Sequence, residues 1–273
     1  MPDSLVLLNV ADGVARLTLN RPHKRNALTR EMLAELISRL KEIRSRSDVR
    51  CVVLSASGPW FCAGMDLAQM QEAAARPDAP KIWQGDTQLY HDAVKTLFEL
   101  PMPTLAVVQG GAMAGGLGLV LACDMTLATA TATFALPEPK RGITAAIVTP
   151  LLVHRTGPGA AAFILLSGES FAAPRAVQLG ICHIIAADDQ LDTAASGLVN
   201  SILSGAPGAL EITKRQLRAC TAADFPGLLA QAAVVSAEAR ETPEAREGLA
   251  AFLEKRSPAW YPTEDRQARP TSP

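Results

Sequence analysis

Short runs of apolar and β-branched residues predict paired strands at the start of the chain. Leu5–Val10 and Val14–Leu19 flank an Asp-Gly turn, which is the pattern of a β-hairpin. After a polar loop that contains proline, Thr29 precedes apolar positions spaced three and four residues apart over Met32–Ile43. This spacing predicts an amphipathic helix whose first turn is capped by Thr29. Cys51–Leu54 then predicts a short buried strand.

The middle of the chain alternates strands and helices, with strand, strand, helix as the recurring unit. Apolar runs predict three further strands, at Leu105–Val108, Met125–Ala128 and Cys182–Ile185. Helices are expected at Asp86–Glu99, Leu117–Cys123, Ile147–Arg155, Ala160–Leu166 and Pro174–Gly180. Residues 71–82 are polar with alanine and proline, and we expect a mobile insertion there that suits ligand selection. The element order predicts an α/β fold.

The last part of the chain has a different pattern. From Leu191 to about residue 255 the periodicity is helical, and the segment carries more charge than the part before it. We therefore expect an α/β core over residues 1–190, a C-terminal helical region over residues 191–257 and a flexible tail over residues 258–273. Prolines and the scarcity of periodic apolar residues favour flexibility in that tail.

Composition narrows the class of protein. Of the 273 residues, 48% are hydrophobic and 19% are charged, so the chain can bury a substantial core. The formal net charge is -1 and the charges are scattered, which gives no basic patch for nucleic acid and no anchor for a membrane surface. No apolar stretch reaches the roughly 18 residues that a membrane span requires. We expect a cytoplasmic protein that binds a small molecule or other proteins.

Cysteine and histidine spacing argues against metal chemistry. The five cysteines are odd in number, far apart and without a CxxC pair. The four histidines form no HxH or HxxxH pair. We expect reduced thiols, with no disulfide framework, no metal site and no bound cofactor.

Two separated loops of small residues each precede an apolar segment. The first is Cys62–Leu67, where Gly64 would let the backbone approach a ligand closely, and the second is Gly110–Gly118. Backbone N–H groups at the start of a helix have no acceptor within the helix, so both loops suit an anion. The alternative is that these glycines only form tight turns. The absence of a following lysine argues against a Walker-type phosphate site, and no acid stands at the spacing of a Rossmann site.

Four blocks of sequence together resemble the signature of a known family. They occur in the order Asn20–Leu28, Phe61–Leu67, Gly110–Asp124 and Phe134–Glu138. In order and spacing they resemble the crotonase (enoyl-CoA hydratase/isomerase) superfamily, and the resemblance spans residues 5–256. It implies a spiral of ββα turns, a C-terminal helical trimerisation region, and assembly as a homotrimer or a dimer of trimers. It also implies an acyl-CoA substrate and no separate cofactor.

The resemblance assigns roles to particular residues. The backbone N–H groups of Met65 and Gly115 would hold the thioester oxygen in an oxyanion hole, and Glu138 would be the general acid/base. Desolvation between apolar neighbours would raise the pKa of Glu138 toward the range useful for proton transfer. Coenzyme A would lie against Lys24, Arg25, Ala27, Ala63, Asp66, Leu67, Phe252 and Lys255. The substrate pocket would include Gly64, Gly118, Arg141 and Ile143.

Gly118 departs from the pattern, because hydratases of the superfamily usually have a second glutamate there to hold the attacking water. Gly-x-Gly-Leu in the second loop and Ala145–Pro150 resemble bacterial hydratases of methylglutaconyl-CoA and isohexenylglutaconyl-CoA, which act in leucine and acyclic-terpene breakdown. This favours a hydratase of a branched or glutaconyl-type substrate. His91 and Asp92 could supply the missing acid/base function, but a lone histidine without a motif favours an ordinary helix residue. A Δ3,Δ2-enoyl-CoA isomerase would need Glu138 alone. A non-catalytic acyl-CoA-binding scaffold is the alternative of another class.

Overall fold

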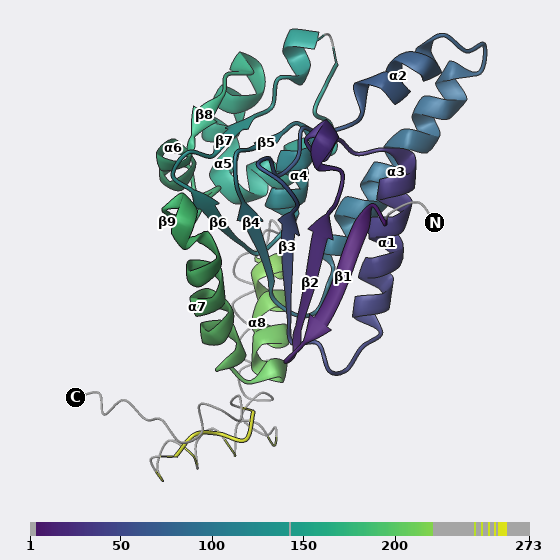
Figure 1. The fold of residues 1–273 in the computed structure, drawn as a ribbon. Helices are drawn as coiled ribbons and strands as arrows, with labels where there is room; N and C mark the ends of the chain where they lie inside the picture. The colour runs from purple at the N-terminus through teal and green to yellow at the C-terminus, as the bar shows by residue number, and fades with distance from the viewer. Residues whose placement is uncertain are drawn as a thin grey trace. The chain divides into compact units, whose positions relative to one another are not determined.

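The chain divides into two compact units. The computed structural model describes residues 4–141, 143–220, 243, 247, 251, 254 and 256–260. One unit contains Met1–Leu100 and Thr104–Ala195, and the other contains Pro101–Pro103 and Ser196–Pro273. The first unit carries both β-sheets and every residue of the two glycine-containing loops (Figure 1).

The larger sheet has six strands in the order β1-β2-β3-β4-β6-β9. Their bounds are β1 Val6–Ala11, β2 Val14–Leu19, β3 Cys51–Ala56, β4 Thr104–Val108, β6 Met125–Thr129 and β9 Ile184–Ala186. The β1–β2 hairpin is antiparallel, as predicted from the Asp-Gly turn, and all the other neighbours are parallel. Strand β4 is buried along its whole length, because both faces of a parallel sheet are covered.

A second sheet of three short strands stands beside the two loops. It consists of β5 (Gly111–Met113), β7 (Thr133–Ala135) and β8 (Phe171–Ala172) in the order β5-β7-β8. The prediction of a loop from Gly110 up to the helix at Leu117 is therefore wrong for β5. Gly-Ala-Met has no strand propensity of its own, and β5 forms because it pairs in register with β7, more than twenty positions away.

The helices follow the predicted order. They are α1 Arg30–Arg44, α2 Leu67–Ala74, α3 Ala79–Phe98, α4 Gly115–Ala122, α5 Val148–Ser167, α6 Ala173–Gln178, α7 Leu191–Leu203 and α8 Pro207–Ala219. The predicted cap of α1 is confirmed, since the Thr29 hydroxyl accepts the Met32 N–H at 3.2 Å. The two predicted helices after Ala146 form a single element, α5, interrupted at Gly157, whose φ is 76° and which precedes Pro158.

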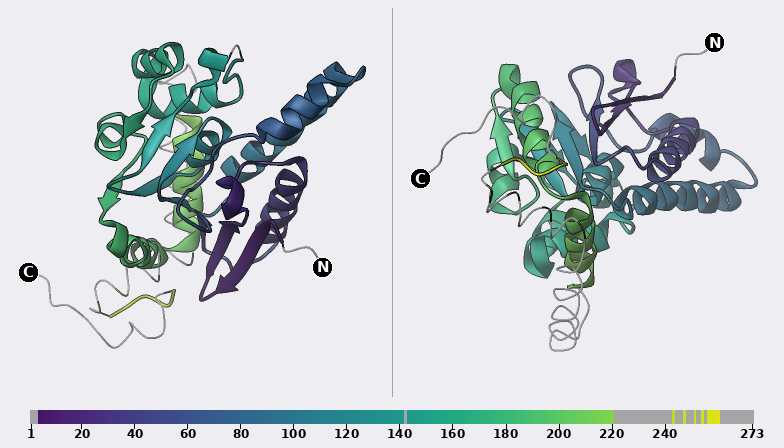
Figure 2. Two further views of the ribbon diagram at one scale, coloured as in Figure 1. Left: turned by 45° about the horizontal axis from the view of Figure 1, so that its top comes forward. Right: turned by 90° about the horizontal axis from the view of Figure 1, so that it is seen from below.

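The expected mobile insertion over residues 71–82 is mostly helical. Residues 71–74 end α2 and residues 79–82 begin α3, so only residues 75–78 lie between the helices. Alanine favours helix, and Pro80 falls in the first turn of α3, where its missing N–H breaks no helical bond. Figure 2 shows the N-terminal end of α3, with α2 beside it, extending beyond the larger sheet.

The second unit continues the helical pattern among its described residues. The buried Lys214 of α8 donates to the Met102 carbonyl at 2.8 Å, and the Trp260 indole N–H donates to the Ser204 carbonyl at 2.9 Å. No helix in the part of the chain that the structure describes is long and apolar enough to cross a bilayer. The molecule thus has the expected α/β architecture of two sheets followed by a C-terminal helical region.

Candidate active site

The two loops singled out in the sequence run side by side. Cys62 and Ala112 form a parallel bridge, in which Cys62 N donates to Gly111 O at 3.1 Å and Met113 N donates to Cys62 O at 2.9 Å. These bonds hold the first loop along β5. Both loops therefore reach the N-terminus of α4 from the same direction.

Gly64 allows a close approach between the loops. Its φ is 95°, a left-handed value that side chains rarely adopt. A Cβ at Gly64 would lie 2.8 Å from the Ala114 Cβ, 3.0 Å from the Met113 carbonyl oxygen and 3.3 Å from the Gly115 nitrogen. Only glycine therefore fits, and the first loop lies against the Gly115 N–H group.

The Met65 N–H points away from Leu28, the residue that pairs with Met65 in a parallel bridge. Leu28 donates to Gly64 O at 2.8 Å and accepts from Asp66 N at 2.9 Å, so the backbone groups flanking Met65 face Leu28. In a parallel bridge of this kind the N–H of the middle residue points to the opposite side. Among the described residues, no hydrogen bond takes up the N–H of Met65.

The Gly115 N–H is available for a different reason. Gly115 is the first residue of α4, so its N–H has no acceptor within the helix. Ala114, which precedes it, has φ 51° and ψ −126°, a backbone conformation that is strained for any residue with a side chain. The Ala114 N–H bonds to Ala135 O at 2.9 Å, which fixes this strained link. Two N–H groups on adjacent segments can together stabilise one oxygen that gains negative charge.

Glu138 comes to the same place through the second sheet. The β5–β7 register pairs Met113 with Ala135, and Glu138 follows three residues later, at the start of a short 3-10 helix. The residue is only 7% exposed. Its backbone carbonyl accepts the Ile143 N–H at 3.2 Å, which closes the turn around it. A buried carboxyl thus stands near the N-terminus of α4.

The space beside Gly118 is filled by Tyr90 of α3. A Cβ at Gly118 would lie 2.0 Å from the Tyr90 hydroxyl oxygen and 2.9 Å from the Val148 Cγ2. The hydroxyl donates to the Gly115 carbonyl at 2.7 Å. Burial above all, and then the charges on Cys62 and Glu138, raise the pKa of Tyr90 well above 10, so the phenol stays protonated.

The sequence analysis missed Tyr90 and pointed to its neighbours instead. His91 is exposed and pairs with Asp92 at 3.0 Å on the outer face of α3. Tyr90 shares its spacing with the buried residues Ala93, Val94 and Leu97. This periodicity was a signal that Tyr90 faces inward, although not a signal of what it meets there.

The predicted coenzyme A residues of the first block lie on a tightly held loop. Lys24 and Arg25 are exposed, and the Arg25 guanidinium lies 5.1 Å from the centroid of the Trp60 ring. Ala63 N donates to Arg25 O at 3.0 Å, which joins this loop to the first glycine loop. The fully buried Asn26 anchors it, since its Nδ2 atom donates to the carbonyls of Ser57 and Trp60 at 3.0 and 2.7 Å.

Asp66 has structural partners for its carboxylate. It pairs with Arg21 at 2.6 Å and caps α2 by accepting the N–H groups of Ala68 and Gln69. Burial opposes its ionisation, but these hydrogen bonds prevail and lower the pKa of Asp66. Leu67 is 56% exposed next to it. Ala27 accepts from the Arg21 guanidinium at 3.2 Å, so Arg21 connects both predicted parts of the coenzyme A site.

Three predicted residues cannot be located fully. Phe252 and Lys255 lie outside the described residues, and so does the side chain of Arg141. Ile143, by contrast, is described and is 42% exposed. The structure brings Gly64 against Gly115 at the start of α4 and places Tyr90 against both Gly115 and Gly118, while the charge of Glu138 acts on Tyr90.

A hollow of about 390 Å³ lies between α3 and the start of α5. Its lining consists of Trp83, Gln84, Thr87, Gln88, His91 and Ile147. Five of these residues belong to α3, and Ile147 is the N-cap of α5. The lining is apolar with neutral polar groups, apart from the titratable His91.

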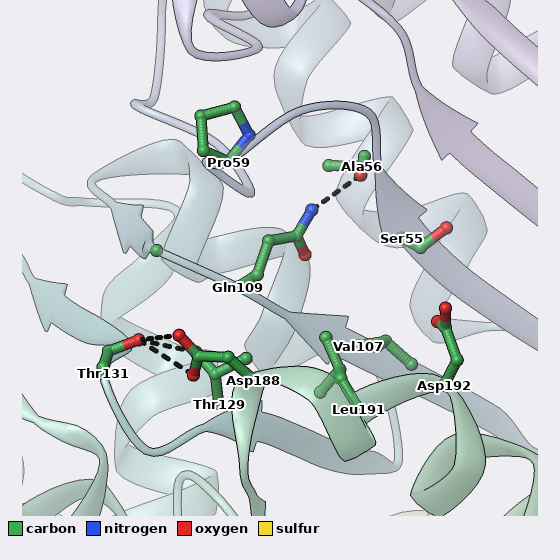
Figure 3. A pocket seen from close by; sticks show the side chains of 11 residues that line it. Ser55, Ala56, Pro59, Val107, Gln109, Thr129, Thr131, Asp188, Leu191 and Asp192 are labelled. Carbon is green, nitrogen blue, oxygen red and sulfur yellow. Dashed lines mark hydrogen bonds between the residues drawn. The ribbon is translucent and has the colours of Figure 1, made fainter.

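A second pocket, of about 470 Å³, lies at the carboxyl ends of β3, β4 and β6 and contains none of the predicted site residues (Figure 3). In it the Thr131 hydroxyl bonds to Asp188, and the Gln109 amide donates to the Ala56 carbonyl at 2.7 Å. No group of three or more histidine, cysteine, aspartate or glutamate side chains in the described ranges could hold a metal ion.

Known proteins share this fold and sequence. The enoyl-CoA hydratase/isomerase family model matches residues 9–263. A Thermus thermophilus protein of the enoyl-CoA hydratase type is 36% identical over 245 residues, covering 90% of this chain and 96% of its own. The 2,3-dehydroadipyl-CoA hydratase of Escherichia coli is 32% identical over 93% of this chain and 98% of its own. The crystal structure of an enoyl-CoA hydratase from Mycobacterium smegmatis matches with a TM-score of 0.88 and 34% identity, over 94% of this chain and 99% of that one.

These matches define an α/β enzyme that acts on acyl-CoA. The chain belongs to the enoyl-CoA hydratase/isomerase family of the crotonase superfamily. Its reaction is that of a hydro-lyase or an isomerase.

Proposed function

We propose that the protein is an enoyl-CoA hydratase in which Met65 and Gly115 hold the thioester oxygen and Glu138 transfers protons. The contact of Gly64 with the N-terminus of α4 carries the proposal, because it sets the two N–H groups on adjacent segments. The burial of Glu138 near the same helix end supports it. An amide pair fixed in advance stabilises the enolate oxygen without reorganisation during the reaction.

One carboxylate can carry out both proton transfers of hydration. The Glu138 carboxylate takes a proton from water while the water oxygen bonds to the β-carbon of the substrate. The electron pair of the double bond moves through the α-carbon to the thioester oxygen, where the two N–H groups stabilise it. The protonated Glu138 then gives its proton to the α-carbon as the carbonyl re-forms. Dehydration is the same sequence in reverse.

The acyl group would lie toward the hollow between α3 and α5. Trp83 and Ile147 provide apolar surface, while Gln84, Gln88 and Thr87 provide hydrogen-bonding groups. This lining suits a branched acyl chain with a polar far end, such as a glutaconyl-type substrate of the methylglutaconyl or isohexenylglutaconyl kind. The similarity to a hydratase of a dehydroadipyl thioester, which also carries a carboxyl at its far end, is consistent with this choice.

Coenzyme A would pass along the exposed Lys24 and Arg25 toward Ala63 and Leu67. Its phosphates would meet the two cations, and its adenine would meet backbone near the start of α2. Side-chain contact from Asp66 is not part of this proposal, because its carboxylate is already bound to Arg21. Phe252 and Lys255 of a neighbouring subunit, in a homotrimer or a dimer of trimers, would complete the site.

One observation favours a second candidate, a Δ3,Δ2-enoyl-CoA isomerase. Because Tyr90 fills the space at Gly118, Glu138 is the only carboxyl that we place at the reacting carbons. A shift of a double bond moves a proton from one carbon to another and consumes no water. A single carboxylate is sufficient for that reaction.

The two candidates are separated by absorbance at the band of the conjugated enoyl thioester. The panel contains crotonyl-CoA, a 3-enoyl-CoA and a branched glutaconyl-CoA, each with wild type, Glu138→Gln and Glu169→Gln. Glu169 is an exposed carboxylate paired with Lys140 and serves as the control. Absorbance lost from a conjugated substrate, dependent on Glu138 and not on Glu169, is the result expected of a hydratase. Absorbance gained only from the 3-enoyl substrate would establish the isomerase, and binding without turnover would establish a scaffold.

A further inference from the structure

We propose that Tyr90 is a positioning residue that holds Gly115, and with it half of the oxyanion hole, by filling the space beside Gly118. The inference rests on the proposed function, since it concerns the hole formed by Met65 and Gly115. It adds a residue that the sequence blocks do not contain. Three contacts carry it.

The first contact excludes any side chain at position 118. With the Tyr90 hydroxyl 2.0 Å from the place of a Cβ, neither glutamate nor alanine fits at Gly118 unless the phenol moves. The glycine at this position and the tyrosine on α3 are therefore one structural feature.

The second and third contacts fall on Gly115. The Tyr90 hydroxyl donates to the Gly115 carbonyl at 2.7 Å. The ring atoms Cε2 and Cζ of Tyr90 stand 3.2 and 3.3 Å from the place of a Gly115 Cβ. A bond to its carbonyl and a ring against the place of its Cβ fix the orientation of Gly115. The N–H that faces the thioester oxygen belongs to the same residue.

The phenol supplies position and not proton transfer. A carbonyl oxygen can only accept, so the Tyr90 proton is used in the bond to Gly115. A phenol is neutral at physiological pH, and burial raises the pKa of Tyr90 further, so proton transfer is assigned to Glu138. Removing the hydroxyl should weaken the stabilisation of the oxyanion without changing which group titrates.

Infrared spectroscopy of a bound substrate tests this role directly. Crotonyl-CoA with ¹³C at the thioester carbonyl is bound to Glu138→Gln, which should not turn it over, and to Glu138→Gln/Tyr90→Phe. A hydrogen-bonded carbonyl stretches at lower frequency, so the shift on binding reports the strength of the hole. Phenylalanine keeps the ring packing, and circular dichroism verifies the fold of each variant.

We expect a clear lowering of the carbonyl frequency in Glu138→Gln and at most half of that lowering when Tyr90 is also replaced. In the Glu138 background, Tyr90→Phe should lower kcat about tenfold with KM changed by less than about twofold, and with an unchanged pH profile. Thr96→Val is the control, since among the described residues the Thr96 hydroxyl bonds to Asp92 O, within the same helix. It should leave both the frequency and kcat unchanged.

Equal shifts with and without the Tyr90 hydroxyl would overturn the inference and leave the proposed function intact. No shift in Glu138→Gln would overturn the oxyanion hole itself, and the role of Tyr90 with it. A pH profile that changes in Tyr90→Phe would also refute the positioning role, because the phenol would then take part in proton transfer.

Discussion

Arg21 and Asp66 are 45 positions apart in the chain, yet the Nη1 atom of Arg21 lies 2.6 Å from the Oδ2 atom of Asp66. The other carboxylate oxygen, Oδ1, accepts the N–H groups of Ala68 and Gln69 in the first turn of α2. One buried carboxylate thus joins the polar loop of the first sequence block to the segment that follows Met65. The position of the Met65 N–H therefore depends on a residue that has no part in the chemistry.

Replacing Asp66 by asparagine should reduce stability at pH 7 by about 1 kcal/mol, because asparagine keeps the cap of α2 but loses the ion pair. Despite the opposing effect of burial, the Arg21 and backbone hydrogen bonds lower the pKa of Asp66. A carboxyl of this kind adds stability above its unfolded pKa, and the contribution is lost as pH falls through the folded pKa. In urea unfolding, the difference between wild type and Asp66→Asn should therefore shrink between pH 7 and pH 3.

The matched control for Asp66→Asn is Arg46→Gln. The Arg46–Asp48 pair has the same 2.6 Å separation but lies exposed on the surface. Surface pairs contribute little to stability, so this substitution should leave unfolding nearly unchanged. If the two substitutions lowered the free energy of unfolding equally, burial would add nothing to the contribution of the Arg21–Asp66 pair to stability.

Gly64→Ala should damage both stability and turnover. The left-handed φ of 95° costs an alanine about 1–2 kcal/mol, and the new Cβ would push against Ala114 and the Gly115 nitrogen. Because the hole would widen, we expect kcat to fall by about 10²-fold. Steady-state kinetics and urea unfolding measure the two effects. Gly85→Ala is the control, since a Cβ at Gly85 in α3 meets nothing within 4 Å and should leave kcat unchanged.

Local signals account for the features that the sequence predicted well. The Asp-Gly turn, the Thr29 cap and the spacing of α1 each involve residues close together in the chain. The family resemblance carried by the four blocks implies that Met65, Gly115 and Glu138 share one site, and this stays a prediction. Strand β5 could not be predicted in this way, because Gly111–Met113 becomes a strand only through pairing with β7.

Tyr90 shows the limit of the same reasoning more sharply. Its spacing relative to Leu97 predicts an inward-facing side chain, but the contact with Gly118 arises only when α3 packs on α4. The sequence shows that position 118 is a glycine and not a glutamate. The tyrosine that fills its space comes from a helix with no motif.

The raised pKa of Tyr90 predicts its behaviour at high pH. The chain has two tyrosines, so in Tyr261→Phe the phenolate absorbance reports Tyr90 alone. Burial first, and then the charges of Cys62 and Glu138, hold the pKa of Tyr90 well above 10, so native protein should show no phenolate band at pH 10.5. In the unfolded chain the Tyr90 phenol ionises near pH 10. Above pH 10 the unfolded state therefore binds fewer protons than the native state. The contribution of Tyr90 to the free energy of unfolding is therefore fully present below pH 10 and is lost as the pH rises toward the folded pKa. A phenolate band in the folded protein at pH 10 would contradict the burial of Tyr90.

Gly118→Ala tests whether the glycine and the tyrosine form one feature. In wild type the new Cβ would lie 2.0 Å from the Tyr90 hydroxyl oxygen, so the phenol must leave its bond to Gly115. Overpacking of this kind costs about 1–3 kcal/mol. In a Tyr90→Phe background the nearest ring atom, Cζ, would be 3.3 Å away, and the close contact with Val148 would remain. Gly118→Ala should therefore cost less stability in that background, with a coupling of at least about 0.5 kcal/mol in a double-mutant cycle followed by urea unfolding. The same cycle with Thr96→Val should be additive, because the Thr96 hydroxyl bonds within its own helix. Additive costs for Gly118→Ala and Tyr90→Phe would place the phenol elsewhere, and the space at Gly118 would then be open to a second catalytic group.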